Sequence, residues 1–120
     1  MNAASNDKGR LTTHVLDTAN GTPAAGMQID LYKIDGTARE LLLTIKTNAD
    51  GRADAPLMES DNFHKGVYEL VFHAGQYFNR DEDISFVDQV PIRFGINNAS
   101  EHYHVPLLVS PFSFSTYRGS

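Results

Sequence analysis

The 120-residue sequence contains no cysteine, so it has neither a disulfide framework nor a thiol nucleophile nor a thiolate metal site. It also lacks a concentration of positive charge. Ten Lys and Arg residues are scattered among fifteen Asp and Glu residues, and the formal net charge is −5. Proteins that bind nucleic acid carry a clustered basic surface. We therefore expect no nucleic-acid partner.

Long hydrophobic runs are absent as well. No apolar segment approaches the ~18 residues that suggest a transmembrane helix, so we expect no membrane partner. Residues 1–10 are polar and lack the apolar run of a signal peptide, which predicts a disordered leader. We expect a cytoplasmic protein, or a periplasmic one if a signal peptide has been removed upstream. Residues 11–120 are predicted to form a single domain.

Apolar and polar residues alternate in six segments of the remaining chain. This period-two pattern predicts β-strands over residues 11–17, 27–32, 41–45, 66–73, 90–96 and 102–109. Turn signals such as Asp35-Gly36 and Asp50-Gly51 separate them. The stretch from Gln76 to Asp83 has a helix-compatible composition and predicts one short helix. Short strands between turns indicate an all-β fold, an antiparallel β-sandwich in which each sheet buries one face.

Two histidines stand out on the last of these strands. His102 and His104 are two residues apart, so their imidazoles project from the same face. Pro106 cannot donate a ladder hydrogen bond, which predicts an edge or bulged strand with accessible side chains. Paired imidazoles suit proton transfer near neutral pH. Two histidines that only decorate a polar sheet face give the same pattern, and the residues alone leave both interpretations open.

A third imidazole and a guanidinium occur earlier in the chain. His14 lies on the first predicted strand, and Arg52 directly follows the Asp50-Gly51 turn. An arginine offers a planar, permanently charged fork to an anionic substrate or transition state. Taken alone, each residue is equally compatible with a structural or solvent-exposed role.

The end of the chain carries an unusual set of functional groups. Tyr117, Arg118 and Ser120 put a phenol, a guanidinium and a hydroxyl where chains usually fray. A functional tail must be held in place. An exposed aromatic stretch containing Phe112 and Phe114 favours a neighbouring subunit as the holder, because monomers avoid such apolar patches. A disordered tail is the alternative.

Four motifs resemble those of the 5-hydroxyisourate hydrolases. They are Leu11-Thr-Thr-His14-Val-Leu-Asp17, Asp50-Gly-Arg52, Glu101-His-Tyr-His-Val-Pro-Leu-Leu108 and Ser115-Thr-Tyr-Arg-Gly-Ser120. The match runs from residue 11 to residue 120 in the right order, and the terminal Tyr-Arg-Gly-Ser is its most specific part. The resemblance implies a transthyretin-like sandwich of two four-stranded sheets. It also implies a homotetramer, a dimer of dimers, with active sites in a channel between the dimers.

The same resemblance implies an activity and a set of site residues. The activity is the hydrolysis of 5-hydroxyisourate to 2-oxo-4-hydroxy-4-carboxy-5-ureidoimidazoline in urate degradation, without a cofactor or a metal. By the family pattern the catalytic residues are His14, Arg52, His104 and Ser120, and the substrate contacts are Tyr117, His102 and Arg118. Transthyretin, the hormone-carrying relative, lacks the histidine-rich strand and the Tyr-Arg-Gly-Ser ending, which favours an enzyme over a carrier.

The chemistry of ring opening fits these residue types. Hydrolysis of a cyclic ureide needs a base for the proton of the attacking water and donors for the developing oxyanion. We expect His14 and His104 to activate and orient the water, and Arg52 to stabilise the negative charge. Three alternatives remain at this point. They are a zinc hydrolase with His14, His102 and His104 as ligands, a carrier of small molecules, and a structural sandwich without a site.

Overall fold

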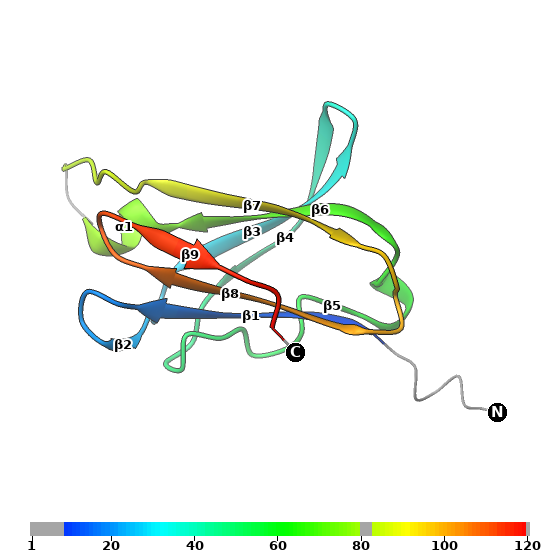
Figure 1. The fold of residues 1–120 in the computed structure, drawn as a ribbon, viewed down its shortest axis with the longest axis horizontal. Helices are drawn as coiled ribbons and strands as arrows, with labels where there is room; N and C mark the ends of the chain where they lie inside the picture. Colours follow the sequence, from blue (N-terminus) through cyan, green and yellow to red (C-terminus); the bar gives the residue numbers. More distant parts are fainter. Residues whose placement is uncertain (1–8, 80–82, 120) are drawn as a thin grey trace.

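The computed structural model describes residues 9–79 and 83–119, which form two packed layers of β-sheet (Figure 1). The first layer has the strand order β2-β1-β8-β9, and β5 pairs with the other end of β1. Its strands are β1 (Arg10–Asp17), β2 (Thr22–Pro23), β5 (Met58–Glu59), β8 (His102–Val109) and β9 (Phe114–Thr116). The second layer has the order β4-β3-β6-β7. Its strands are β3 (Gln28–Asp35), β4 (Ala38–Lys46), β6 (Gly66–His73) and β7 (Gln89–Ile96).

The core lies between the inner faces of the two layers. In β1 the residues at odd positions, Leu11 and Val15 among them, are fully buried, and those at even positions face outward. The opposite layer contributes the largest buried side chains, which include Tyr68, Leu70 and Phe72 of β6. Alternation therefore assigns each strand an inner and an outer face. The outward side chains of β1 and β8 do not belong to the core between the layers.

Most of the predicted elements are confirmed. The six alternating segments all form strands, and Gly21, Gly36 and Gly51 adopt positive φ in the turns between them. Three further strands, β2, β5 and β9, have only two or three residues each and were not predicted, because so short a segment shows no alternation. The first strand begins at Arg10, one residue before the predicted start, and Gly9 donates a hydrogen bond to Ala99 O. The rest of the predicted leader, residues 1–8, lies outside the described residues.

The helix is shorter than predicted and begins earlier. The structure has α1 at Ala74–Phe78, whereas the sequence predicts a helix from Gln76 to Asp83. Asn79 and Asp83 are not helical, and residues 80–82 lie outside the described residues. A five-residue helix is too short to show a hydrophobic period, so its ends are set by the strands that it joins.

One pair of strands is parallel rather than antiparallel. β1 and β8 run in the same direction, with Arg10 opposite His102, Thr12 opposite His104 and His14 opposite Pro106. All other pairings in the two sheets are antiparallel. This parallel pair sits at the centre of the first layer and aligns the outward residues of the first and the eighth strands side by side.

The prediction that Pro106 marks an edge strand is wrong, because β8 lies between β1 and β9. The ladder between β8 and β9 begins at Leu107, paired with Thr116, and the next contact on that side joins His104 to Gly119. Pro106 falls in the gap between these contacts, where a backbone N–H is not needed. Its carbonyl accepts a hydrogen bond from Thr116 Oγ1 at 2.7 Å. An interior proline is tolerated here because the neighbouring strand has already left the ladder.

Helix length also bears on membrane association. In the part of the chain that the structure describes, no helix is long and apolar enough to cross a membrane.

Candidate active site

A pocket of about 410 Å³ opens on the outer face of the first layer. Outward residues of β1 and β8 form one wall, and the loop that follows Gly51 forms the other. Its lining includes Arg10, Thr12, Arg52, His102 and His104. Basic and polar groups thus converge on a single hollow in a chain whose net charge is negative.

A threonine joins the two histidines of β8. Thr12 Oγ1 lies 2.7 Å from His102 Nε2 and 2.8 Å from His104 Nδ1. The contact follows from the parallel register, which places Thr12 directly beside His104. A hydroxyl carries one proton, so Thr12 can donate to only one of these nitrogens and must accept from the other. The choice of which nitrogen carries the proton in one ring therefore depends, through Thr12, on the choice in the other ring.

Backbone hydrogen bonds hold Arg52 beside His14. The two residues form an isolated antiparallel bridge, and Gly51 O accepts a hydrogen bond from Val15 N at 2.8 Å. Asn48 closes the turn, because its Oδ1 accepts from Asp50 N at 2.9 Å and from Arg52 N at 3.1 Å. The guanidinium is thus attached to a turn that is tied to the central strand of the site.

The environment keeps the histidines neutral. Burial, and after it the positive charge of Arg52, lowers the pKa of both His14 and His104 below the usual value. Burial and the charges of Arg10 and Arg118 lower the pKa of His102 in the same direction. Neutral imidazoles can accept a proton, whereas imidazolium cannot. The site therefore presents bases at neutral pH.

The C-terminal segment lies against β8. Gly119 N donates a hydrogen bond to His104 O at 2.7 Å. Tyr117 is 60% exposed and lines a second, smaller hollow with Ile92 and Phe94 rather than the histidine pocket. The guanidinium of Arg118 contacts Glu101 at 2.9 Å. Ser120 lies outside the described residues.

The structure thus brings together most of the residues singled out in the sequence. His102, His104 and Arg52 share the pocket, and His14 is coupled to Arg52 through the backbone bridge. Within one chain, Tyr117 and Arg118 do not line this pocket, although Arg118 donates to the backbone oxygen of His102 at 3.3 Å. Sequence reasoning missed Thr12, although alternation from His14 places it on the same outward face of β1.

The zinc site of the alternative hypothesis requires at least three ligand side chains that are grouped around one ion. Across residues 9–79 and 83–119, no three side chains of His, Asp or Glu are grouped so that they could hold a metal ion. Instead, the nitrogens of His102 and His104 that face one another are both engaged by Thr12. One nitrogen of each ring is thus occupied by a hydrogen bond.

Comparison with known proteins extends this description. The model of the HIUase/Transthyretin family matches residues 11–119 of the chain. The chain belongs to this family. The match includes both strands of the pocket, the Arg52 turn and the segment up to Gly119.

Relatives within the HIUase/Transthyretin family show which of its branches the chain is similar to. The chain is 60% identical to 5-hydroxyisourate hydrolase 2 of Rhizobium meliloti (strain 1021) over 116 residues, which cover 93% of this chain and 97% of the relative. The structure of Klebsiella pneumoniae 5-hydroxyisourate hydrolase matches with a TM-score of 0.80 and 37% identity, covering 93% of this chain and 99% of that one. Transthyretin from Sparus aurata has the same fold, with a TM-score of 0.83, but only 26% identity over 92% of this chain and 96% of that one. The sequence is thus more similar to these hydrolases than to this transthyretin.

Proposed function

We propose that the chain hydrolyses 5-hydroxyisourate to 2-oxo-4-hydroxy-4-carboxy-5-ureidoimidazoline. The observation that carries this proposal is the pocket in which Arg52 faces His104 and His102, with Thr12 between the two rings. Relatives that are 50 to 60% identical are named 5-hydroxyisourate hydrolases, which supports the same substrate. A base, a second imidazole and a fixed cation are the groups that the opening of a cyclic ureide requires.

The reaction consumes one water and needs no other reactant. The water oxygen attacks a ring carbonyl carbon while an imidazole takes the water's proton. The bond between that carbon and the ring nitrogen then breaks, the carbon becomes a carboxyl group, and the nitrogen receives the proton. Arg52 stabilises the negative charge that develops on oxygen in between. We expect neither a cofactor nor a metal to take part.

His104 is the base in this scheme. Its Nδ1 is engaged by Thr12, so only its Nε2 is available to a water in the pocket. When His104 Nδ1 donates to Thr12, the hydroxyl donates onward to His102 Nε2, and His104 Nε2 is unprotonated. In this arrangement the tautomer of His104 is coupled to that of His102 through Thr12. His14 orients the water from the adjacent strand.

The tail completes the site in an assembled protein. We propose a homotetramer, a dimer of dimers, in which Tyr117 and Ser120 orient the substrate at a subunit boundary. The exposed aromatic residues Phe112, Phe114 and Tyr117 support this proposal, because an assembly would cover them. We also propose a cytoplasmic location.

The charged lining of the pocket disfavours the carrier alternative. A pocket for an apolar hormone is lined mainly by apolar side chains with few polar groups. Here two arginines, two histidines, two threonines and a single aspartate contribute to the lining. Such a lining suits a small polar ring with anionic character.

The ultraviolet decay of freshly generated 5-hydroxyisourate tests the proposal. The protein should accelerate this decay well above the spontaneous rate, and His104→Ala should lose about 100-fold or more of kcat/KM, because it removes the general base. His64→Ala is the matched control, since His64 lies exposed in the loop before β6. It should retain full activity. Decay at the spontaneous rate with the unsubstituted protein would overturn the proposal.

A further inference from the structure

Glu101 and Tyr103 flank the histidine His102 but have no role in the reaction proposed above. We propose that they form, with Arg118, a tail clasp: a set of contacts that holds the C-terminal segment so that Gly119 stays packed against His104. Arg118 is then a positioning residue rather than a substrate contact. The effect on catalysis rests on the proposed function, whereas the clasp itself does not.

The segment after β9 has few other attachments. The ladder with β8 ends at Thr116, and the next backbone contact is the hydrogen bond from Gly119 N to His104 O at 2.7 Å. Gly119 also lies very close to the imidazole, because a Cβ built on it would come within 2.6 Å of His104 Cδ2. The backbone of the tail therefore packs directly against the His104 ring, and displacing the tail removes this contact.

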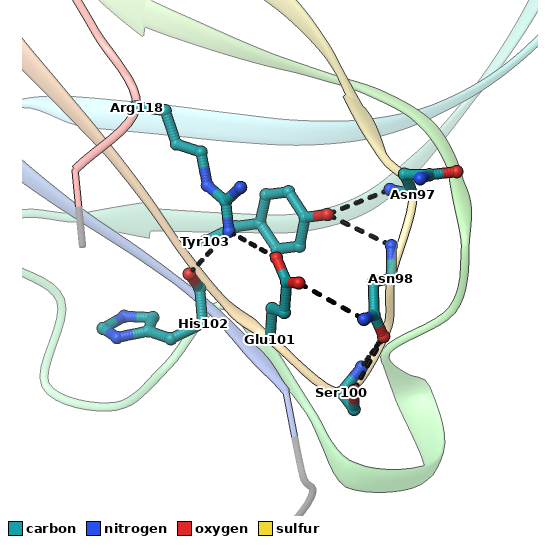
Figure 2. A network of polar contacts seen from close by, with 7 residues as sticks. All are labelled: Asn97, Asn98, Ser100, Glu101, His102, Tyr103 and Arg118. Atoms are coloured by element: carbon teal, nitrogen blue, oxygen red, sulfur yellow. Dashed lines mark hydrogen bonds and ion pairs between the residues drawn. The ribbon is translucent and has the colours of Figure 1, made fainter.

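The side chain of Arg118 supplies the additional attachment. Its Nη2 donates to Glu101 Oε1 at 2.9 Å and to the backbone oxygen of His102 at 3.3 Å. Its guanidinium carbon lies 4.0 Å from the centroid of the Tyr103 ring, within the range of a cation–π contact. Figure 2 shows these contacts together, with the imidazole of His102 pointing away from the guanidinium.

The two side chains that Arg118 contacts, Glu101 and Tyr103, are held by hydrogen bonds from the loop that joins β7 to β8. Tyr103 is buried, and its hydroxyl oxygen accepts hydrogen bonds from Asn97 N at 3.0 Å and Asn98 N at 3.1 Å (Figure 2). Glu101 Oε2 accepts from Asn98 Nδ2 at 3.2 Å. These hydrogen bonds orient the Glu101 carboxylate and the Tyr103 ring without any contribution from the tail. The tail is held by a loop that links the two layers of the sandwich.

The clasp should govern local opening of the tail rather than global stability. The side chains of Arg118 and Glu101 are each about half exposed, at 53% and 47%, and ion pairs in such positions contribute little to folding. A chain end, however, opens by itself without unfolding the rest of the molecule. The informative measurement is therefore protection of the Gly119 amide, which reports the bond to His104 directly.

Amide hydrogen exchange of the ¹⁵N-labelled full chain tests the inference. Glu101→Gln removes the charge that Arg118 contacts, and Arg118→Lys removes the planar fork and the stacked guanidinium. Both should accelerate exchange at Gly119 by about tenfold while amides of β3 and β6 keep their protection. Glu40→Gln, which changes an exposed glutamate of β4, is the matched control and should change neither. The kcat/KM for 5-hydroxyisourate should fall in both clasp variants.

Several outcomes would contradict the clasp. Unchanged exchange at Gly119 in both clasp variants overturns it, as does unprotected exchange at Gly119 in the original protein. Loss of activity in Arg118→Lys alone, with Gly119 still protected and Glu101→Gln fully active, would instead make Arg118 a substrate contact. Failure of the proposed function is seen separately, as an absence of activity in the original protein, and leaves the exchange result valid.

Discussion

At the residue scale, a single hydroxyl links two histidines of the candidate site. Thr12 contacts a ring nitrogen of both His102 and His104, so the proton positions of the two imidazoles are linked. The sequence predicted His102, His104 and Arg52, because their chemistry is visible in their side chains. It did not single out Thr12, because a threonine on a strand is an ordinary β-former. Its importance arises only from the register of β1 against β8.

The charge of Arg52 should be detectable in the titration of its neighbours. Burial and this charge lower the pKa of His14 and His104, so Arg52→Gln should raise both values. Protonation then occurs at higher pH, and the acidic limb of the kcat/KM profile should move to higher pH with it. NMR titration of the imidazole Cε1–H signals measures both pKa values.

Arg52→Lys provides the control for this titration. Lysine keeps the charge, so the histidine pKa values should remain low, but it lacks the planar fork, and kcat/KM should fall by about tenfold or more. Equal histidine titration in all three proteins would show that Arg52 does not act on the imidazoles electrostatically.

At the scale of elements, turns position the site as much as strands do. Gly51 adopts φ +75° directly before Arg52, and a Cβ there would lie 2.4 Å from Val15 O. Only glycine combines the left-handed conformation with this close approach to β1. The Asp-Gly signal predicted the turn correctly. It did not predict the packing of the turn against β1, because that contact joins segments far apart in the sequence.

Substitution of Gly51 and of Gly36, which both have positive φ, separates the cost of backbone strain from the cost of steric overlap. Gly51→Ala should lower the free energy of unfolding by about 3 kcal/mol or more, through strain and overlap with Val15 O. Gly36→Ala, at φ +64° with nothing within 4 Å of its added Cβ, should cost about 1 kcal/mol from strain alone. Urea unfolding at one fixed protein concentration compares the two. Equal losses would show that the Gly51 contact is relaxed in solution.

At the scale of the whole molecule, the outer face of the first layer combines the site with an apolar pair. Leu16 and Leu108 lie opposite one another on β1 and β8, both facing outward and only partly buried. The sequence predicted the two-layer sandwich from alternation alone. It could not give the parallel pairing of β1 with β8, because alternation is the same in either direction. Nor does alternation say which outer face is covered by another subunit.

We expect Leu16 and Leu108 to lie in a contact between subunits of the proposed tetramer. Sedimentation velocity should show a species of four chains, each of 13.3 kDa. Leu108→Glu should dissociate it, because a charge would be buried at the contact between dimers. Leu41→Glu places the same charge at an exposed position of β4 in the other layer and should leave the assembly intact. A monomeric original protein, or an intact Leu108→Glu assembly, would contradict this arrangement.

The parallel pairing of β1 with β8 also has a consequence for biosynthesis. Thr12 and His104 are separated by 92 positions in the chain, and β1 leaves the ribosome long before β8 has been translated. Until then the first strand has an open edge that can pair with other nascent chains. Chains that stall before residue 102 would therefore be aggregation-prone substrates for chaperones and proteases, and the contacts of Thr12 with the two histidines would form only after β8 has been translated.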